Sequence, residues 1–169
     1  MKLVVGITGS TGVIYGIRLL EILKRLNIET HLVMSQWAEK CISMETNHDL
    51  NYVKSLATES SDEANMAASI SSGTHKTDGM IVIPCSMKTL SSVANGYDET
   101  LVARAAGVML KESRKLILVV VIGVLIFGAA KIPQLAKTFG KAKSEYRKGE
   151  IEGDNELKDF KEKKNNETS

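Results

Sequence analysis

A short apolar run that passes through closely spaced glycines into a helical pattern constrains the fold of this chain most. Residues 3–8 are apolar or β-branched, as in a strand buried within a parallel sheet. Gly6, Gly9 and Gly12 are spaced three residues apart, and apolar residues then recur with helical spacing over residues 13–26. This order predicts a strand, a glycine loop and a helix.

The same alternation continues along the chain. Strands are expected over residues 29–35, 79–84 and 115–120, and helices over residues 36–44, 86–95 and 99–112. Gly96 is expected to end one helix, and Asp98 to cap the next. The polar residues 47–72 are expected to form helix fragments and loop. Strands that alternate with helices predict an α/β fold, a doubly wound parallel sheet covered on both faces.

Composition limits the class of protein only weakly. The hydrophobic fraction of 43% and the charged fraction of 25% are ordinary for a soluble globular protein, and a net charge of +2 points to no particular partner. The first residues do not form a secretory signal peptide, because their apolar run is too short. We therefore expect the N-terminal domain to be cytoplasmic, and we expect no nucleic-acid partner.

The cysteines and histidines do not indicate a metal site. Cys41 and Cys85 have no zinc-binding spacing, and the three histidines are scattered. Both cysteines lie in apolar surroundings, which is typical of reduced, buried thiols. We expect no metal.

Hydroxyl side chains follow three of the predicted strands. Ser10 and Thr11 follow the first, Ser35 ends the second, and Ser86 to Thr89, with Lys88 among them, follow the third. The carboxyl ends of parallel strands meet at one crevice, where a helix N-terminus favours an anion. Each hydroxyl could instead be an ordinary helix cap. The glycine loop could likewise be a tight turn that holds no ligand. Hydroxyls at three strand ends favour a phosphorylated ligand.

Several motifs together resemble the UbiX-type flavin prenyltransferases over about residues 2–120. They occur in order and are Gly6-Ile7-Thr8-Gly9-Ser10-Thr11-Gly12, His31-Leu32-Val33-Met34-Ser35, Ile70-Ser71-Ser72-Gly73, Pro84-Cys85-Ser86-Met87-Lys88-Thr89 and Ala103-Arg104-Ala105-Ala106. The resemblance implies a flavodoxin-like fold, FMN as the cofactor and a homo-oligomer. It also implies transfer of a prenyl group from dimethylallyl phosphate to the flavin.

The resemblance also implies functional residues, because positions of this sequence match functional positions of the family. One carboxylate, Glu45, matches an acidic residue near the prenyl donor, which would make it a catalytic residue, although it could equally be a solvated carboxylate at a helix end. The implied FMN-binding residues are Gly9, Ser10, Thr11, Ser35, Ser86, Met87, Lys88 and Thr89. Val121 stands where the family has a flavin-contacting arginine, and the family's later segment has no counterpart. We therefore expect an incomplete domain over residues 1–115 and an impaired activity.

A second resemblance follows, to TatA, a subunit of the twin-arginine protein translocase. It rests on an apolar segment over residues 116–130, Phe127-Gly128, a basic amphipathic pattern over residues 131–149 and a charged tail over residues 150–169, which we expect to be disordered. The basic pattern has six lysines and arginines against one glutamate. The resemblance implies binding to an anionic membrane surface and to translocase subunits.

Residues 115–120 belong to both resemblances. They are a central strand in the first family and the start of a membrane helix in the second. Fifteen uncharged residues follow Lys115, and as a helix they would span about 22 Å, less than the ~30 Å of a bilayer core. The sequence leaves both states open, although one backbone cannot adopt both at once.

Overall fold

A computed structural model describes residues 1–120, all of which belong to one compact unit, Met1–Gly123. The elements are β1 (Lys2–Ile7), α1 (Val13–Arg25), β2 (Glu29–Met34), α2 (Gln36–Glu45), α3 (Leu50–Ser55), β3 (Glu59–Asp62), the 3-10 turn η1 (Ser69–Ser71), β4 (Gly79–Val82), α4 (Met87–Asn95), α5 (Leu101–Lys111) and β5 (Lys115–Leu118). The predicted segments over residues 131–149 and 150–169 lie outside the described residues, as does most of the apolar segment 116–130.

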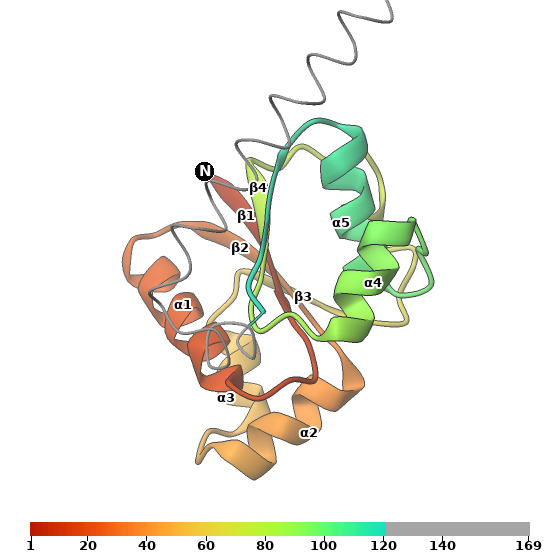
Figure 1. Cartoon of the computed structure of the whole chain (residues 1–169). Helices are drawn as coiled ribbons and strands as arrows, with labels where there is room; N and C mark the ends of the chain where they lie inside the picture. Colours follow the sequence, from red (N-terminus) through yellow and green to blue (C-terminus); the bar gives the residue numbers. More distant parts are fainter. Residues whose placement is uncertain (121–169) are drawn as a thin grey trace, which may run out of the picture. The chain divides into compact units, whose positions relative to one another are not determined.

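The strands form one sheet in the order β3-β2-β1-β4-β5, and every neighbouring pair is parallel. Figure 1 shows α1 and α3 on one side of this sheet and α4 and α5 on the other. Without the edge strand β3, the remaining four strands follow the order of the first four strands of a flavodoxin-type sheet. The predicted flavodoxin-like, doubly wound fold is therefore confirmed.

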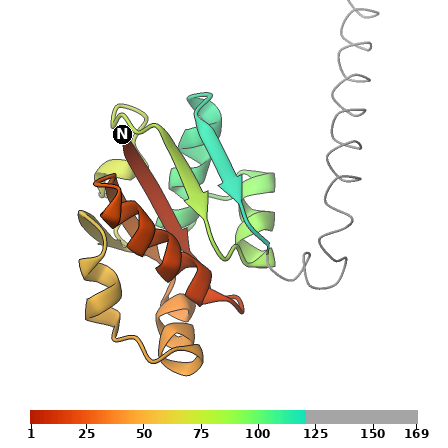
Figure 2. The same ribbon diagram turned by 90° about the vertical axis from the view of Figure 1, so that its left-hand side faces the viewer.

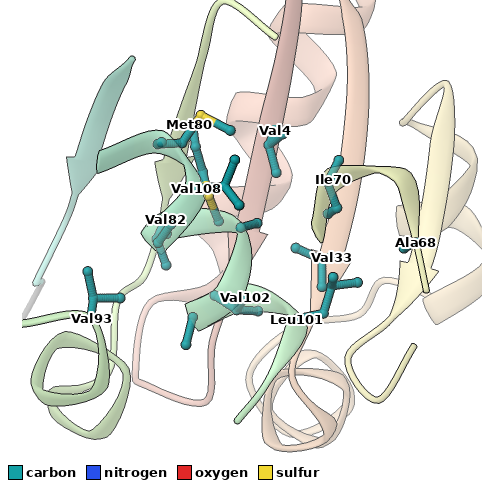
Figure 3. Packing of buried hydrophobic residues seen from close by; sticks show 14 of the residues in the cluster. Val4, Val33, Ala68, Ile70, Met80, Val82, Val93, Leu101, Val102 and Val108 are labelled. Atoms are coloured by element: carbon teal, nitrogen blue, oxygen red, sulfur yellow. The ribbon is translucent and has the colours of Figure 1, made fainter. Parts of the chain in front are cut away.

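Successive side chains of a strand point to opposite faces of the sheet, so alternate residues pack into two separate cores. Val4 of β1 packs with Met80 of β4 against α5, which contributes Val102. Its neighbour Val5 points the other way and packs against α1 and α2. Figure 3 shows the first cluster between the strands and α5, and Figure 2 shows α1 in front of the sheet with α4 and α5 behind it.

The predicted helix ends are correct in one case and wrong in another. Gly96 ends α4 with a φ of 70°, the left-handed conformation that glycine adopts readily. Asp98, however, does not cap the next helix. Thr100 caps α5 by accepting a hydrogen bond from the Ala103 N–H, while Asp98 pairs with Arg104 at 3.1 Å. The helix begins two residues later than expected, so that Thr100 and not Asp98 is its N-cap residue.

The polar segment 47–72 contains a strand that sequence patterns did not predict. β3 consists of Glu-Ser-Ser-Asp, which lacks the apolar character of a buried strand. Within residues 1–120 it pairs only with β2, in the register His31 to Glu59 and Val33 to Ser61. An edge strand with polar side chains keeps its backbone paired on one side and solvated on the other.

Residues 115–118 form a strand in this structure. β5 pairs with β4 from Gly79–Lys115 to Val82–Leu118, and the Val119 N–H donates to the Val82 carbonyl oxygen at 2.9 Å. Residues 115–118 of the shared apolar run are therefore strand and not helix in this structure. Within residues 1–120, no helix has the length and apolar character needed to cross a membrane.

Candidate functional site

Gly9 occupies a position where the first loop and the start of α2 come very close. A Cβ atom built on Gly9 would overlap the Cβ atom of Trp37, and it would lie 3.2 Å from the Trp37 carbonyl carbon. Any larger residue at position 9 would push the loop away from α2. The glycine is needed here for close packing of two chain segments.

The first turn of α1 has an unusual cap. Gly12 is the N-cap residue with a φ of 98°, and it has no side chain that could bond to the free N–H groups of the helix. Instead, the Gly12 N–H donates to Oε2 of Glu45 at 3.0 Å. The predicted catalytic carboxylate is thus exposed and held beside the glycine loop, at the end of α2.

Thr8 joins this loop to the loop after β4. Its hydroxyl donates to the Pro84 carbonyl oxygen at 2.8 Å and accepts from the Ser86 N–H at 2.7 Å. Both bonds form at a side chain that is 1% exposed. The peptide bond before Pro84 is cis. Sequence reasoning missed Thr8, because a threonine at a strand end has no pattern of its own.

Two predicted serines are the caps of the helices that follow β2 and β4. Ser35 accepts a hydrogen bond from the Ala38 N–H at 3.1 Å, and Ser86 accepts one from the Thr89 N–H at 3.2 Å. Both are therefore the helix caps that the sequence allowed. Their hydroxyls also lie at one cleft, which a cap alone does not require.

This cleft has a volume of about 320 Å³ and lies at the carboxyl end of the sheet. It includes five of the predicted FMN-binding residues. Its lining residues are Gly9, Ser35, Gln36, Trp37, Glu63, Ser86, Lys88, Thr89, Ser92 and Thr100. The other predicted residues, Ser10, Thr11, Met87 and Glu45, are not among them, although all four lie in or beside the adjoining loops.

The caps of three helices meet at the cleft: Ser35 for α2, Ser86 for α4 and Thr100 for α5. Each helix N-terminus carries a partial positive charge, and Lys88 adds a full one. Such a convergence suits an anionic group. A larger hollow of about 660 Å³ lies at the amino end of the sheet, beside Lys2 and Arg114. It lacks helix N-termini, and ligands of open α/β sheets bind at the carboxyl end.

Glu63 is the acidic residue of the cleft, and sequence reasoning missed it because β3 was not predicted. Its Oε2 accepts a hydrogen bond from the Gln36 N–H at 3.1 Å. Burial raises the pKa of the Glu63 carboxyl above its ordinary value, and the Gln36 N–H and Lys88 act in the opposite direction. A carboxyl group with a raised pKa in a cleft is a common sign of a functional position.

The two cysteines are free thiols in this structure, as expected. Cys85 is fully buried beside the cleft, and burial raises its pKa to about 11. Among the described residues, no group of three or more histidine, cysteine, aspartate or glutamate side chains is placed to hold a metal ion.

Several known proteins are similar to this chain over much of its length. A probable UbiX-like flavin prenyltransferase of Escherichia coli O157:H7 is 56% identical over 70% of this chain and 61% of its own length. Flavin prenyltransferase UbiX of Salmonella typhimurium is 50% identical over 70% of this chain and 64% of its own length. The chain thus spans about three fifths of the length of the curated relatives it matches.

Solved structures of the same group share the fold. The crystal structure of AnUbiX (PadA1) in complex with FMN and dimethylallyl pyrophosphate has a TM-score of 0.69 at 50% identity, over 69% of this chain and 62% of that chain. A dodecameric FMN-dependent UbiX-like decarboxylase from Escherichia coli O157:H7 has a TM-score of 0.69 at 55% identity, over 70% and 65% of the two chains.

Two family models match the chain. The mttA/Hcf106 model matches residues 113–156, which include β5, and this agrees with the second resemblance. The flavoprotein model matches residues 1–134 and so covers the whole described structure. The chain therefore belongs to the flavoprotein family, with a segment similar to the mttA/Hcf106 family at its C-terminal side.

Proposed function

We propose that the cleft at the carboxyl end of the sheet binds FMN. The observation that carries this proposal is the convergence of three helix caps, Ser35, Ser86 and Thr100, with Lys88 at one cleft. A phosphate group needs N–H and hydroxyl donors and a positive potential, and these groups supply both. FMN is also present in the AnUbiX complex that shares this fold.

In this proposal, the described residues divide into three groups. Ser35, Ser86, Thr89 and Lys88, which the resemblance gives as FMN-binding residues, hold the phosphate. Gly9 allows the first loop to stay close to α2, and Trp37 offers an aromatic surface to the flavin ring. Ser10, Thr11 and Met87 lie beside the cleft, where the rest of the flavin would extend.

The reaction that the relatives' names indicate is prenylation of the flavin. Bound FMN would supply the ring that accepts a prenyl group from dimethylallyl phosphate. This chain's own part is to orient the flavin and to stabilise the charge on the departing phosphate with fixed donors. Glu45, held by the Gly12 N–H beside the glycine loop, is the proposed catalytic carboxylate.

A flavin titration tests the binding proposal. Purified full-length protein should quench the fluorescence of added FMN, and Ser86→Ala should weaken binding by roughly tenfold through loss of one hydroxyl contact. Ser91→Ala is the matched control, because Ser91 is exposed on the same helix and does not line the cleft. Unchanged FMN affinity in Ser86→Ala would contradict the proposed phosphate contact. Mass spectrometry of the flavin after addition of dimethylallyl phosphate then measures prenyl transfer.

We also propose that the chain is a homo-oligomer. A UbiX-like relative is described as dodecameric. Around the cleft, Trp37 and Met87 are 66% and 60% exposed, and both are large apolar side chains. Association with other copies would remove such side chains from water. Sedimentation analysis should give a mass above that of one chain, and a monomer at every concentration would contradict this proposal.

A second candidate function is favoured by the mttA/Hcf106 match over residues 113–156. We propose that residues 121–149 attach the chain to an anionic membrane surface, with the flavoprotein domain on the cytoplasmic side, and bring it to translocase subunits. The excess of lysine and arginine over residues 131–149 is the supporting feature. Flotation with vesicles should carry the protein upward when they contain anionic lipid. Equal flotation with neutral vesicles would contradict an electrostatic attachment.

A further inference from the structure

The cleft that we propose for FMN contains a carboxylate where its other groups favour an anion. Ser35, Ser86 and Thr100 cap three helices there, and Lys88 adds a positive charge. Glu63 comes from the segment after β3 and is the acidic side chain of the lining. A carboxylate in this position competes with any anionic ligand for the same donors.

Hydrogen bonding shows which donor Glu63 occupies. Its Oε2 accepts from the N–H of Gln36, the first residue of α2, at 3.1 Å. The N–H of Ala38, in the same turn, is already bonded to the Ser35 hydroxyl. The free N–H groups of a first helical turn are the ones that bind anions. In this turn of α2, Glu63 therefore holds a donor that a phosphate group would use.

We infer that Glu63 acts as a proton-linked competitor for the phosphate of the bound flavin, so that phosphate binding is accompanied by uptake of a proton at this carboxyl. The inference rests on the proposed FMN binding and adds a specificity determinant to it. A neutral carboxyl no longer repels the phosphate. Its hydrogen bond with the Gln36 N–H is also weaker and breaks more easily. The proton comes from solvent and is released again when the flavin leaves.

The charges around Glu63 agree with this role. Burial, Asp62 of β3 and Glu39 of α2 raise the pKa of the Glu63 carboxyl, while the Gln36 N–H and Lys88 of α4 lower it. A phosphate in the cleft adds a further negative neighbour and raises the pKa again. The affinity for a phosphorylated flavin should therefore fall as the pH rises and Glu63 becomes charged. A flavin without phosphate should be insensitive to Glu63.

The test compares FMN with riboflavin in the wild-type full-length protein and in Glu63→Gln. The amide preserves the shape of the side chain and can still accept from the Gln36 N–H. Near pH 8, Glu63→Gln should bind FMN about tenfold more tightly than the wild type, as expected for a coupling of one pKa unit. Near pH 5, the ratio of the two affinities should be smaller than near pH 8, because a larger share of the wild-type carboxyl is protonated at the lower pH. Riboflavin affinities should be equal at both pH values.

Glu99→Gln is the matched control. It removes the same charge from an exposed residue that directly precedes Thr100 and does not line the cleft. It should bind FMN like the wild type at both pH values. The ionisation of free FMN is common to all three proteins and cancels in their ratios.

Two results would overturn the inference: a ratio of wild-type to Glu63→Gln affinity that does not change with pH, or weaker FMN binding by Glu63→Gln. Thermal unfolding with inorganic phosphate separates this inference from the FMN proposal. If FMN does not bind but phosphate raises Tm more in Glu63→Gln than in the wild type, the FMN proposal fails and the role of Glu63 stands. If neither FMN nor phosphate has an effect, both fail.

Discussion

The hydroxyl of Thr8 accepts a hydrogen bond from the N–H of Ser86 at 2.7 Å, across 78 positions of sequence. It also donates to the Pro84 carbonyl oxygen at 2.8 Å, so a single buried side chain joins the ends of β1 and β4. These two strands flank the point where the chain reverses its direction across the sheet. The bond therefore sets the spacing of the two loops on either side of the cleft.

Thr8→Val should destabilise the domain, since it keeps the shape of the side chain but removes the acceptor for the partly buried Ser86 N–H and one of the two donors to the Pro84 carbonyl oxygen. We expect a loss of about 1–3 kcal/mol in the free energy of unfolding, measured with urea. Thr11→Val is the control, because Thr11 is exposed. Equal stability of Thr8→Val and wild type would contradict the importance of this bond.

Gly9→Ala should also be destabilising, because the new Cβ would overlap the Cβ of Trp37. Neither atom is the end of a flexible side chain, so backbone must move, at a cost of about 1–3 kcal/mol. Truncation of Trp37 to alanine should not rescue the variant, since the Cβ remains, whereas Trp37→Gly should restore part of the lost stability. Gly107→Ala serves as the control, as its Cβ meets only the movable carboxylate of Asp98. Rescue by Trp37→Ala would show that the proposed overlap is not the cause.

His31 should make stability depend on pH. Burial lowers its pKa below the ordinary value of 6.5, although Glu59 opposes this. Its Nε2 is 2.8 Å from the Ser61 hydroxyl oxygen, and its Nδ1 is 3.0 Å from a Glu59 oxygen. As the pH falls below 6.5, the unfolded chain binds more protons than the folded one, so the free energy of unfolding decreases.

Urea unfolding near pH 7.5 and near pH 5 measures this effect. The decrease should be larger in the wild type than in His31→Gln, which cannot titrate. Contributions from other groups, including Glu63, are present in both proteins and cancel in the comparison. An equal decrease in both proteins would rule out His31 as the cause.

Cys85 should be inert to thiol reagents in the folded protein. It is fully buried, and burial raises its pKa to about 11, so at pH 8 only about one thiol in a thousand is ionised. Cys41 is partly exposed and should react first. In Cys41→Ser, a colorimetric thiol assay should show no fast reaction until urea is added. Fast reaction of that variant without urea would contradict the burial of Cys85.

Local sequence was sufficient to predict the first strand and helix, and to identify some of the residues that line the cleft. The apolar run, Gly12 and the helical spacing after it correctly predicted β1 and α1, because their hydrogen bonds and buried faces follow from neighbouring residues. Ser35 and Ser86 were found because a hydroxyl after a buried strand is a local pattern. Thr8, Trp37 and Glu63 were missed, since each acquires its role only from a partner distant in sequence.

Tertiary structure decided one segment that the sequence predicted wrongly and one that it left open. Residues 59–62 are polar and form a strand only because β2 offers them a ladder of hydrogen bonds. Residues 115–118 suit either a strand or a helix by composition, and pairing with β4 makes them β5. A helix forms its hydrogen bonds within its own segment, so its sequence carries most of the signal. A strand depends on the neighbour that pairs with it, and that neighbour is known only when the sheet is assembled.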